Sequence, residues 1–258
     1  MTEIKKYLLS LFLLGICITL PCRAESSGCT VNSLADVIKK MQTAVENLKT
    51  LSADMEYLYI QDPELIDAKT LQKGNLYYKT DEKESKILIS FLTRQQDEEP
   101  IQKRPEYYLF DGIWFTKIDT KLETIDRYQK APEDKPVGVF EFISHNFPMV
   151  GFTDPNTLEK EFTITIPTEQ LSDSTHLNLK VKKDSTYKED YTEMDVWVNN
   201  STWLPIRLTA WSTQGDFYDL RWTDIKINKK LENAVFTIET PAHFRKNTHP
   251  LKEQTERN

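Results

Sequence analysis

Residues 203–241 read WLPIRLTAWSTQGDFYDLRWTDIKINKKLENAVFTIETP and decide the fold class. Apolar and polar residues alternate over 206–211, and again over 217–222 after a turn in which Gly215 supplies the left-handed conformation of a tight hairpin. A third strand is predicted just before Pro241, which has no N–H to donate to a ladder. The stretch therefore predicts an antiparallel meander with one apolar face.

The same two-residue period extends towards the N-terminus. Further strands are predicted over 52–59, 73–79, 86–92, 106–110, 113–119, 122–128, 162–166, 177–181 and 194–198. Asp111-Gly112 is a favoured hairpin dipeptide, residues 95–105 read as a polar loop, and the tail from His243 is expected to fray. About ten strands in one antiparallel run make a sheet long enough to curl, because every strand pair twists.

Two segments break the strand period. Ser33 is a good helix N-cap, and apolar residues at helical spacing follow it as far as Leu51. Residues 136–152 are rich in apolar side chains, with Pro136 placed near a first helical turn and Pro148 placed to end the helix. We interpret this segment as a helical lid across the sheet, although a plain core helix fits the spacing equally well.

These elements predict a mainly β fold with helices (α+β). We expect a curved antiparallel sheet or incomplete β-barrel, with an N-terminal helix and a helical lid insert that together enclose an apolar cavity.

The first 24 residues have the pattern of a signal peptide. Lys5 and Lys6 precede an apolar run over 7–20, and Ala24 offers a small residue for cleavage. The run is shorter than the roughly 20 residues of a membrane-spanning helix. We therefore expect export, then a single mature domain over 25–258 with a polar tail from about residue 243. Cys29 is the one cysteine left after cleavage, so no internal disulfide can form.

Composition and motifs argue against several functions. The formal net charge of −7 is unfavourable for binding nucleic acid. The sequence has no Gly-x-Ser-x-Gly, P-loop, His-Glu-x-x-His or Cys-x-x-Cys motif, and its four histidines are scattered. We therefore expect no catalytic residues, no metal site and no cofactor.

The order of several short motifs resembles the LolA/LolB-like periplasmic lipoprotein carrier superfamily, the outer-membrane lipoprotein-sorting proteins. The motifs are, in order, LSADM at 51–55, KGNLYYK at 73–79, FDG at 110–112 followed by Trp114, LPIRL at 204–208 and VFTIETP at 235–241. The chain departs from the family at Thr80, which stands where the family has an arginine that helps to hold the lid shut.

The resemblance implies a monomeric periplasmic carrier that binds acyl chains of lipoproteins or lipids and transfers them towards the outer membrane. It further implies partners in an inner-membrane release complex and an outer-membrane acceptor. We assign the cavity and lid to Leu34, Ile38, Met55, Tyr57, Leu76, Tyr78, Ile89, Trp114, Phe140, Ile143, Phe147, Leu208 and Trp222. Replacing Phe140 or Ile143 by Asp is expected to weaken ligand retention without unfolding the sheet.

Three alternatives remain open from the residues themselves. Aromatic-rich sheets also bind sugars, so the chain could be a secreted carbohydrate- or protein-binding β-module. A sensor of lipids or lipoproteins would need the same cavity as a carrier. A hydrolase would need two carboxylates that converge in a cleft, and an acidic composition alone is no evidence for such a pair.

Overall fold

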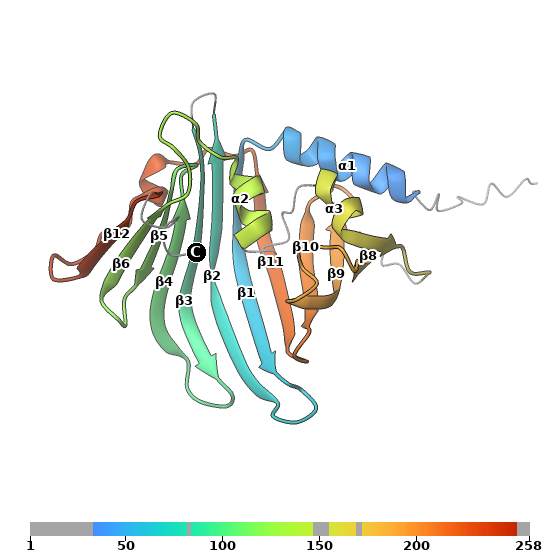
Figure 1. Ribbon diagram of the computed structural model, residues 1–258, viewed down its shortest axis with the longest axis horizontal. Helices are drawn as coiled ribbons and strands as arrows, with labels where there is room; N and C mark the ends of the chain where they lie inside the picture. Colours follow the sequence, from blue (N-terminus) through green and yellow to red (C-terminus); the bar gives the residue numbers. More distant parts are fainter. Residues whose placement is uncertain (1–32, 82–83, 147–154, 169–171, 252–258) are drawn as a thin grey trace, which may run out of the picture. The chain divides into compact units, whose positions relative to one another are not determined.

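A single sheet of twelve strands dominates the computed structural model, which describes residues 33–81, 84–146, 155–168 and 172–251 (Figure 1). The strands are β1 (Thr50–Gln61), β2 (Ala68–Thr80), β3 (Ser85–Gln96), β4 (Gln102–Phe110), β5 (Trp114–Asp119), β6 (Thr124–Gln129), β7 (Phe162–Thr165), β8 (Ser174–Val181), β9 (Tyr191–Asn199), β10 (Pro205–Ser212), β11 (Phe217–Ile227) and β12 (Arg245–His249). Their order is β12-β6-β5-β4-β3-β2-β1-β11-β10-β9-β8-β7.

The sheet is curved and unclosed, an open half-barrel as the sequence predicts. All neighbouring strands pair antiparallel apart from β12, which runs parallel to β6. Turn chemistry agrees with the sequence, because Gly112 and Gly215 adopt φ of 91° and 92°. The predicted number of strands, about ten, is two short.

The helices are α1 (Leu34–Glu46), α2 (Val139–Asn146), α3 (Pro155–Glu161) and a 3₁₀ turn, η2 (Asn233–Phe236). Ser33 caps α1 as predicted, its hydroxyl oxygen accepting a hydrogen bond from the Asp36 backbone N–H at 3.2 Å. The prediction that this helix reaches Leu51 is wrong, because Leu51 already lies in β1 and pairs with Tyr78. Figure 1 shows α2 in front of the sheet, as expected of a helical insert.

The main core lies between the concave face of the sheet and the helices. Val37 and Met41 of α1 and Phe142 and Ile143 of α2 pack in one cluster with inward residues of the sheet such as Leu76. The ring centroid of Phe142 is 3.8 Å from that of Phe110 in β4. The apolar stripe of each helix therefore meets the inward positions of the strands.

The C-terminal segment corrects two predictions. The residues before Pro241 form η2 and irregular chain rather than a strand, and the tail expected to fray contains β12. Phe236 is buried, and Phe244 packs with Ile118 and Ile125 in a second, smaller core. Ile118 and Ile125 pair across β5 and β6 on the convex face, so this segment buries apolar side chains that the concave core cannot reach.

One further prediction is wrong, and others concern residues that the structure does not describe. Residues 95–105 are largely strand, because β3 continues to Gln96 and β4 begins at Gln102. The segment 1–24, with its signal-peptide pattern, lies outside the described residues, as do Phe147 and Pro148. No helix in the described part of the chain has the length and apolarity to cross a membrane.

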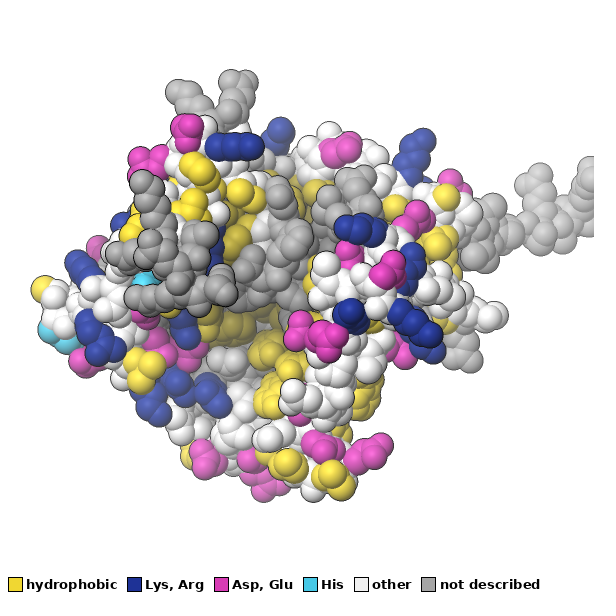
Figure 2. Space-filling model, viewed as in Figure 1, with side chains coloured by type: hydrophobic (Ala, Val, Ile, Leu, Met, Phe, Trp, Pro, Cys, Tyr) yellow, Lys and Arg dark blue, Asp and Glu magenta, His cyan; other side chains and the backbone are white. Residues whose placement is uncertain are grey.

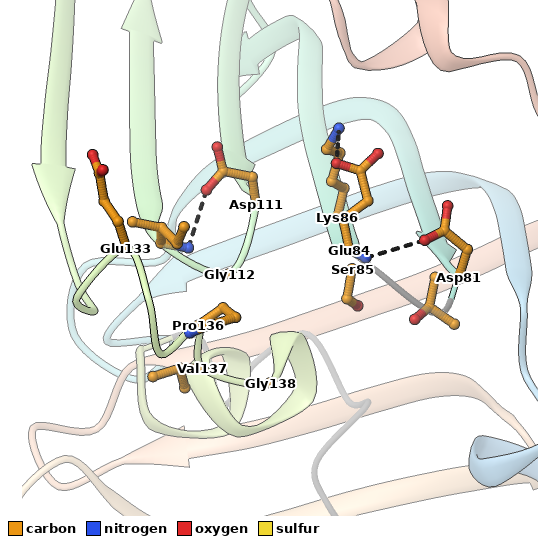
Figure 3. A pocket seen from close by; sticks show the side chains of 12 residues that line it. Asp81, Glu84, Ser85, Lys86, Asp111, Gly112, Glu133, Pro136, Val137 and Gly138 are labelled. Atoms are coloured by element: carbon orange, nitrogen blue, oxygen red, sulfur yellow. Dashed lines mark hydrogen bonds and ion pairs between the residues drawn. The ribbon is translucent and has the colours of Figure 1, made fainter.

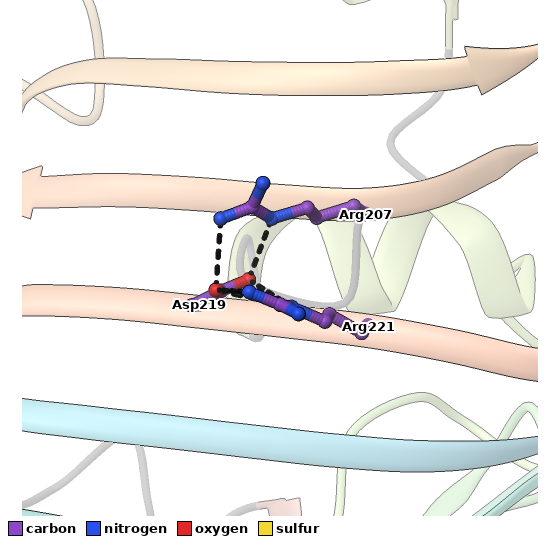
Figure 4. A network of polar contacts seen from close by, with 3 residues as sticks. All are labelled: Arg207, Asp219 and Arg221. Carbon is purple, nitrogen blue, oxygen red and sulfur yellow. Dashed lines mark hydrogen bonds and ion pairs between the residues drawn. The ribbon is translucent and has the colours of Figure 1, made fainter. Parts of the chain in front are cut away.

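A charged network ties β10 to β11 on the convex face (Figure 4). Arg207 donates two hydrogen bonds to the Asp219 carboxylate at 2.9 Å, and Arg221 donates to it from Nη2 at 2.6 Å and from Nε at 3.1–3.2 Å. Burial opposes ionisation of Asp219, but these hydrogen bonds outweigh it and the pKa of Asp219 lies below its ordinary value. The network keeps a buried carboxylate charged on the face away from the main core.

Candidate functional site

The residues assigned to the cavity gather on the concave face, with one exception. Buried in the main core are Ile38, Met55, Leu76, Tyr78, Ile89, Ile143, Leu208 and Trp222; partly buried against it are Leu34, Tyr57 and Phe140. Phe147 lies outside the described residues. The structure thus brings the described members together, and most of them fill the core itself.

Trp114 does not belong with this set. It pairs with Gln129 at the start of β5, and its neighbour Phe115 is the residue that packs on the core cluster. Successive side chains of a strand point to opposite faces, so Trp114 lies on the convex face. There its ring centroid is 4.7 Å from the Arg127 guanidinium. The family-like Asp-Gly-x-Trp motif therefore does not place this tryptophan in a concave cavity.

An aromatic row crosses the concave face beside the buried core. Ring centroids 5.8–6.4 Å apart join, in sequence across the sheet, Tyr191, Tyr218, Tyr57, Phe91, Tyr108, Phe115 and Tyr128. All are half-buried. Figure 2 shows hydrophobic side chains gathered in a hollow near the middle of this face, with charged side chains around it. The row is thus a band of apolar surface that the core does not seal.

Small residues in the intervening strands allow aromatic rings of the row to come close when their own strands are not neighbours. Tyr57 and Phe91 belong to β1 and β3, with β2 between, yet their centroids are 5.8 Å apart. Gly74 of β2 pairs with Phe91 and carries no side chain to separate the rings. On the same face, beyond β1 in the strand order, Ala210 of β10 pairs with Tyr218 of β11. The ring centroid of Tyr218 lies 6.1 Å from that of Tyr191 in β9.

Sequence reasoning found Tyr57 and missed the rest of the row. Each missed residue is an aromatic side chain at an inward position of its own strand. The alternation of apolar and polar residues along that strand could have indicated this position. The signal was weak because no single strand carries more than one of them at the level of the row. Only strand order, which the sequence did not specify, shows that they form a line.

Burial sets the chemistry of the tyrosine hydroxyls in the row. Burial, with smaller contributions from Tyr218 and Asp190, raises the pKa of Tyr191 to about 12. Burial also raises the pKa of Tyr57 and of Tyr108 above the ordinary value, and the hydroxyl of Tyr108 donates to Glu106 at 3.0 Å. These hydroxyls stay neutral at physiological pH, so the row presents apolar rings with neutral polar tips.

A polar cleft of about 530 Å³ lies where the chain enters α2 (Figure 3). The turn after β2, the β4–β5 hairpin and residues 133–138 form its walls, which carry four carboxylates and are too polar for acyl chains. The Val137 N–H donates to the Gly112 carbonyl at 2.9 Å across it. Thr80, which stands where the resembled family has an arginine, also lines this cleft. The Val137 hydrogen bond fastens the chain just before α2 at the same place.

The described residues offer no group of three or more His, Cys, Asp or Glu side chains that could hold a metal ion.

Comparison with known proteins gives a likeness of fold. No family model and no curated protein matches the sequence. An uncharacterized conserved protein from Thermus thermophilus is 9% identical over 84% of this chain and 100% of its own, with a TM-score of 0.49. For the MucA/MucB complex structure from Pseudomonas aeruginosa the identity is 9% and the TM-score 0.44, and this chain spans only 60% of that chain while the match covers 80% of this one.

The third structure is that of a protein from the superfamily that the sequence motifs resemble. A LolA superfamily protein from Nitrosomonas europaea is 13% identical over 80% of this chain and 98% of its own, with a TM-score of 0.34.

Proposed function

We propose that this protein is a non-enzymatic periplasmic carrier that binds the acyl chains of a lipid or lipid-modified protein on its concave face. The aromatic row supports this proposal most strongly, because it is a continuous band of half-buried rings next to the main core. Each CH₂ group removed from water contributes about 0.8 kcal/mol, so a ligand with long chains can bind there without charged contacts.

Transfer requires no cofactor in this scheme. A carrier moves its ligand in one direction when the donor, the carrier and the acceptor bind it with successively higher affinity. The partners that the sequence resemblance implies, a release complex at the inner membrane and an acceptor at the outer membrane, would supply that gradient. The helix α2, whose Phe140 ring lies 4.7 Å from Tyr78, is the element placed to cover a bound chain.

A glycan-binding role finds less support. Trp197 lies on the convex face, where its ring is stacked 4.6 Å from His176 on β8 and 4.5 Å from Arg207 on β10. Side chains of both neighbouring strands therefore already contact the ring that a sugar would need.

The test is mass spectrometry of organic extracts from protein secreted into a periplasm and purified without detergent. We expect a stoichiometric phospholipid or acylated peptide, absent from an unrelated secreted control. The variant Phe91→Ser, in the row, should lose most of this lipid. Phe217→Ser removes a half-buried phenylalanine from the opposite face and should keep it. A protein that carries no lipid and takes up no fluorescent fatty acid would rule the proposal out.

A further inference from the structure

The strongly exposed large hydrophobic side chains of the described residues all lie at one end of the sheet. They are Leu65, Ile66, Ile101, Leu122 and Trp211, with exposed fractions of 84%, 56%, 62%, 65% and 40%. The first four occupy the β1–β2, β3–β4 and β5–β6 turns, and Trp211 lies one residue from the end of β10. Scattered exposed apolar residues are ordinary, but their confinement to one end is not.

Hydrogen bonds tie each of these turns to another turn or to a neighbouring strand, and we call the surface that the turns form the hairpin end. The Asp62 N–H donates to Asp216 in the β10–β11 turn at 3.1 Å, and the Lys69 N–H donates to Asp97 in the β3–β4 turn at 2.6 Å. The Thr120 hydroxyl, after β5, donates to the Pro105 carbonyl in β4 at 2.7 Å. Strands are about 4.8 Å apart, so successive turns follow one another at roughly 10 Å.

The β1–β2 turn holds its apolar residues outward. The backbone N–H groups of Leu65, Ile66 and Asp67 all donate to the Asp62 carbonyl at 2.9–3.1 Å. Asp62 and Asp67 take the left-handed conformation, with φ of 38° and 51°. The backbone of this turn is thus satisfied internally, and the two aliphatic side chains contribute nothing to the core from where they stand.

We propose that the hairpin end docks on a zwitterionic lipid bilayer by inserting these side chains among the headgroups. The proposal rests on the carrier function above. One or two apolar residues on each of several turns spaced across the end fit a planar partner, whereas a protein groove would require one continuous patch. Carboxylates flank them, at Asp62, Glu64 and Asp67 in one turn and at 97–99 in the next, so an anionic surface would be repelled.

Docking in this orientation brings the bilayer to the aromatic row. Tyr218 follows the β10–β11 turn directly, and its ring lies 5.3 Å from Tyr59 near the end of β1. Figure 1 shows the β1–β2 and β3–β4 turns together at the end of the sheet away from α1. A chain leaving the bilayer at these turns therefore meets Tyr218 and Tyr59 first, and Tyr57 of the row next.

The test is flotation of the full-length mature protein with two kinds of vesicle, phosphatidylcholine alone and phosphatidylcholine mixed with phosphatidylglycerol. We expect binding to the first and weaker binding to the second. The double variant Leu65→Ser/Ile66→Ser should lower the partition coefficient for phosphatidylcholine about tenfold or more. Ile113→Ser is the matched control, because it removes an isoleucine from the β4–β5 turn at the opposite end and should leave partitioning unchanged.

Two results would overturn the inference: equal partitioning of the wild type and the double variant, or binding confined to anionic vesicles. Circular dichroism and a urea midpoint equal to that of the wild type would show that the double variant is folded. Protein that copurifies with lipid but never floats would refute the docking surface and leave the carrier function standing. Protein that floats but yields no extracted lipid would refute the carrier function.

Discussion

The concave face has two parts built from the same alternating pattern, and they differ in how completely they are closed. Under α1 and α2, the strand residues Leu76 and Leu208 have exposed fractions of 0% and 2%. In the adjoining aromatic row every ring is half-buried. An inward position in a strand is therefore not the same as a core position: the helices cover some inward residues completely and leave others, such as Tyr57 and Phe91, half-buried.

Gly74 lies at the boundary between the two parts, and its substitution should have the largest effect. It pairs with Met55 of the buried core on one side and with Phe91 of the row on the other. A Cβ atom on Gly74 would lie 1.7 Å from the Ser90 carbonyl oxygen, which belongs to the backbone of β3 just before a β-bulge at 91–93. Gly74→Ala should lower the free energy of unfolding by about 4 kcal/mol or more, measured by urea denaturation.

Gly215→Ala is the control for this change. A Cβ atom there would meet nothing within 4 Å, and the cost is limited to the strain of φ 92° in an alanine, about 1 kcal/mol. Equal losses for the two variants would mean that backbone conformation, and not the close approach of β2 to β3, explains the glycine.

Leu76→Ala tests the buried part. Leu76 is fully buried in the main core, so the cavity left behind should cost about 3 kcal/mol in free energy of unfolding. Because the residue lies away from the row, the amount of lipid extracted per folded molecule should stay at the wild-type level. Loss of lipid with little loss of stability would reverse the roles assigned to the two parts.

The sequence predicted elements well and their partners poorly. The two-residue period identified most strands, and Gly112, Gly215 and Ser33 behave as local chemistry requires. Periodicity also placed Met55 and Leu208 on one apolar face, which is the inner face of the sheet. These predictions succeeded because each depends on residues close together in the chain.

What failed depends on contacts distant in sequence. The residues before Pro241 have β propensity, but the sheet already has neighbours for β11 in β1 and β10, so the chain instead crosses to pair β12 with β6. Trp114 was assigned to the wrong face because a motif, and not the register against Gln129, decided its placement. The aromatic row could not be predicted from the sequence, because its members come from strands whose order only the structure shows.

The lid residues Phe140 and Ile143 should now behave differently, although the sequence alone predicts the same result for both. Ile143 is 1% exposed, so Ile143→Asp buries an uncompensated charge and should unfold the protein or cost about 3 kcal/mol or more. Phe140 is half-buried, and Phe140→Asp should cost about 1–2 kcal/mol. The folded Phe140→Asp protein should retain less lipid in the extraction assay, and unchanged retention would remove α2 from the ligand site.

The change with the smallest expected effect at neutral pH concerns a titrating group in the aromatic row, Tyr191, which has no counterpart in the buried part at Leu76. Burial raises the pKa of Tyr191 from 10.0 to about 12, so the folded protein keeps a proton that the unfolded chain loses above about pH 10. The stabilisation is complete below that pH and disappears as the pH rises from about 10 to about 12. The free energy of unfolding should therefore fall over this range.

Tyr191→Phe should change stability by no more than about 0.5 kcal/mol at pH 7 and make the alkaline decline shallower. Leu76→Ala should lower the whole curve without changing its slope, because no titrating group is lost. Urea midpoints measured across the alkaline range decide between them. An unchanged slope in Tyr191→Phe would mean that the hydroxyl is already solvated in the folded state, and the row would then be more open at its β9 end than its half-buried rings indicate.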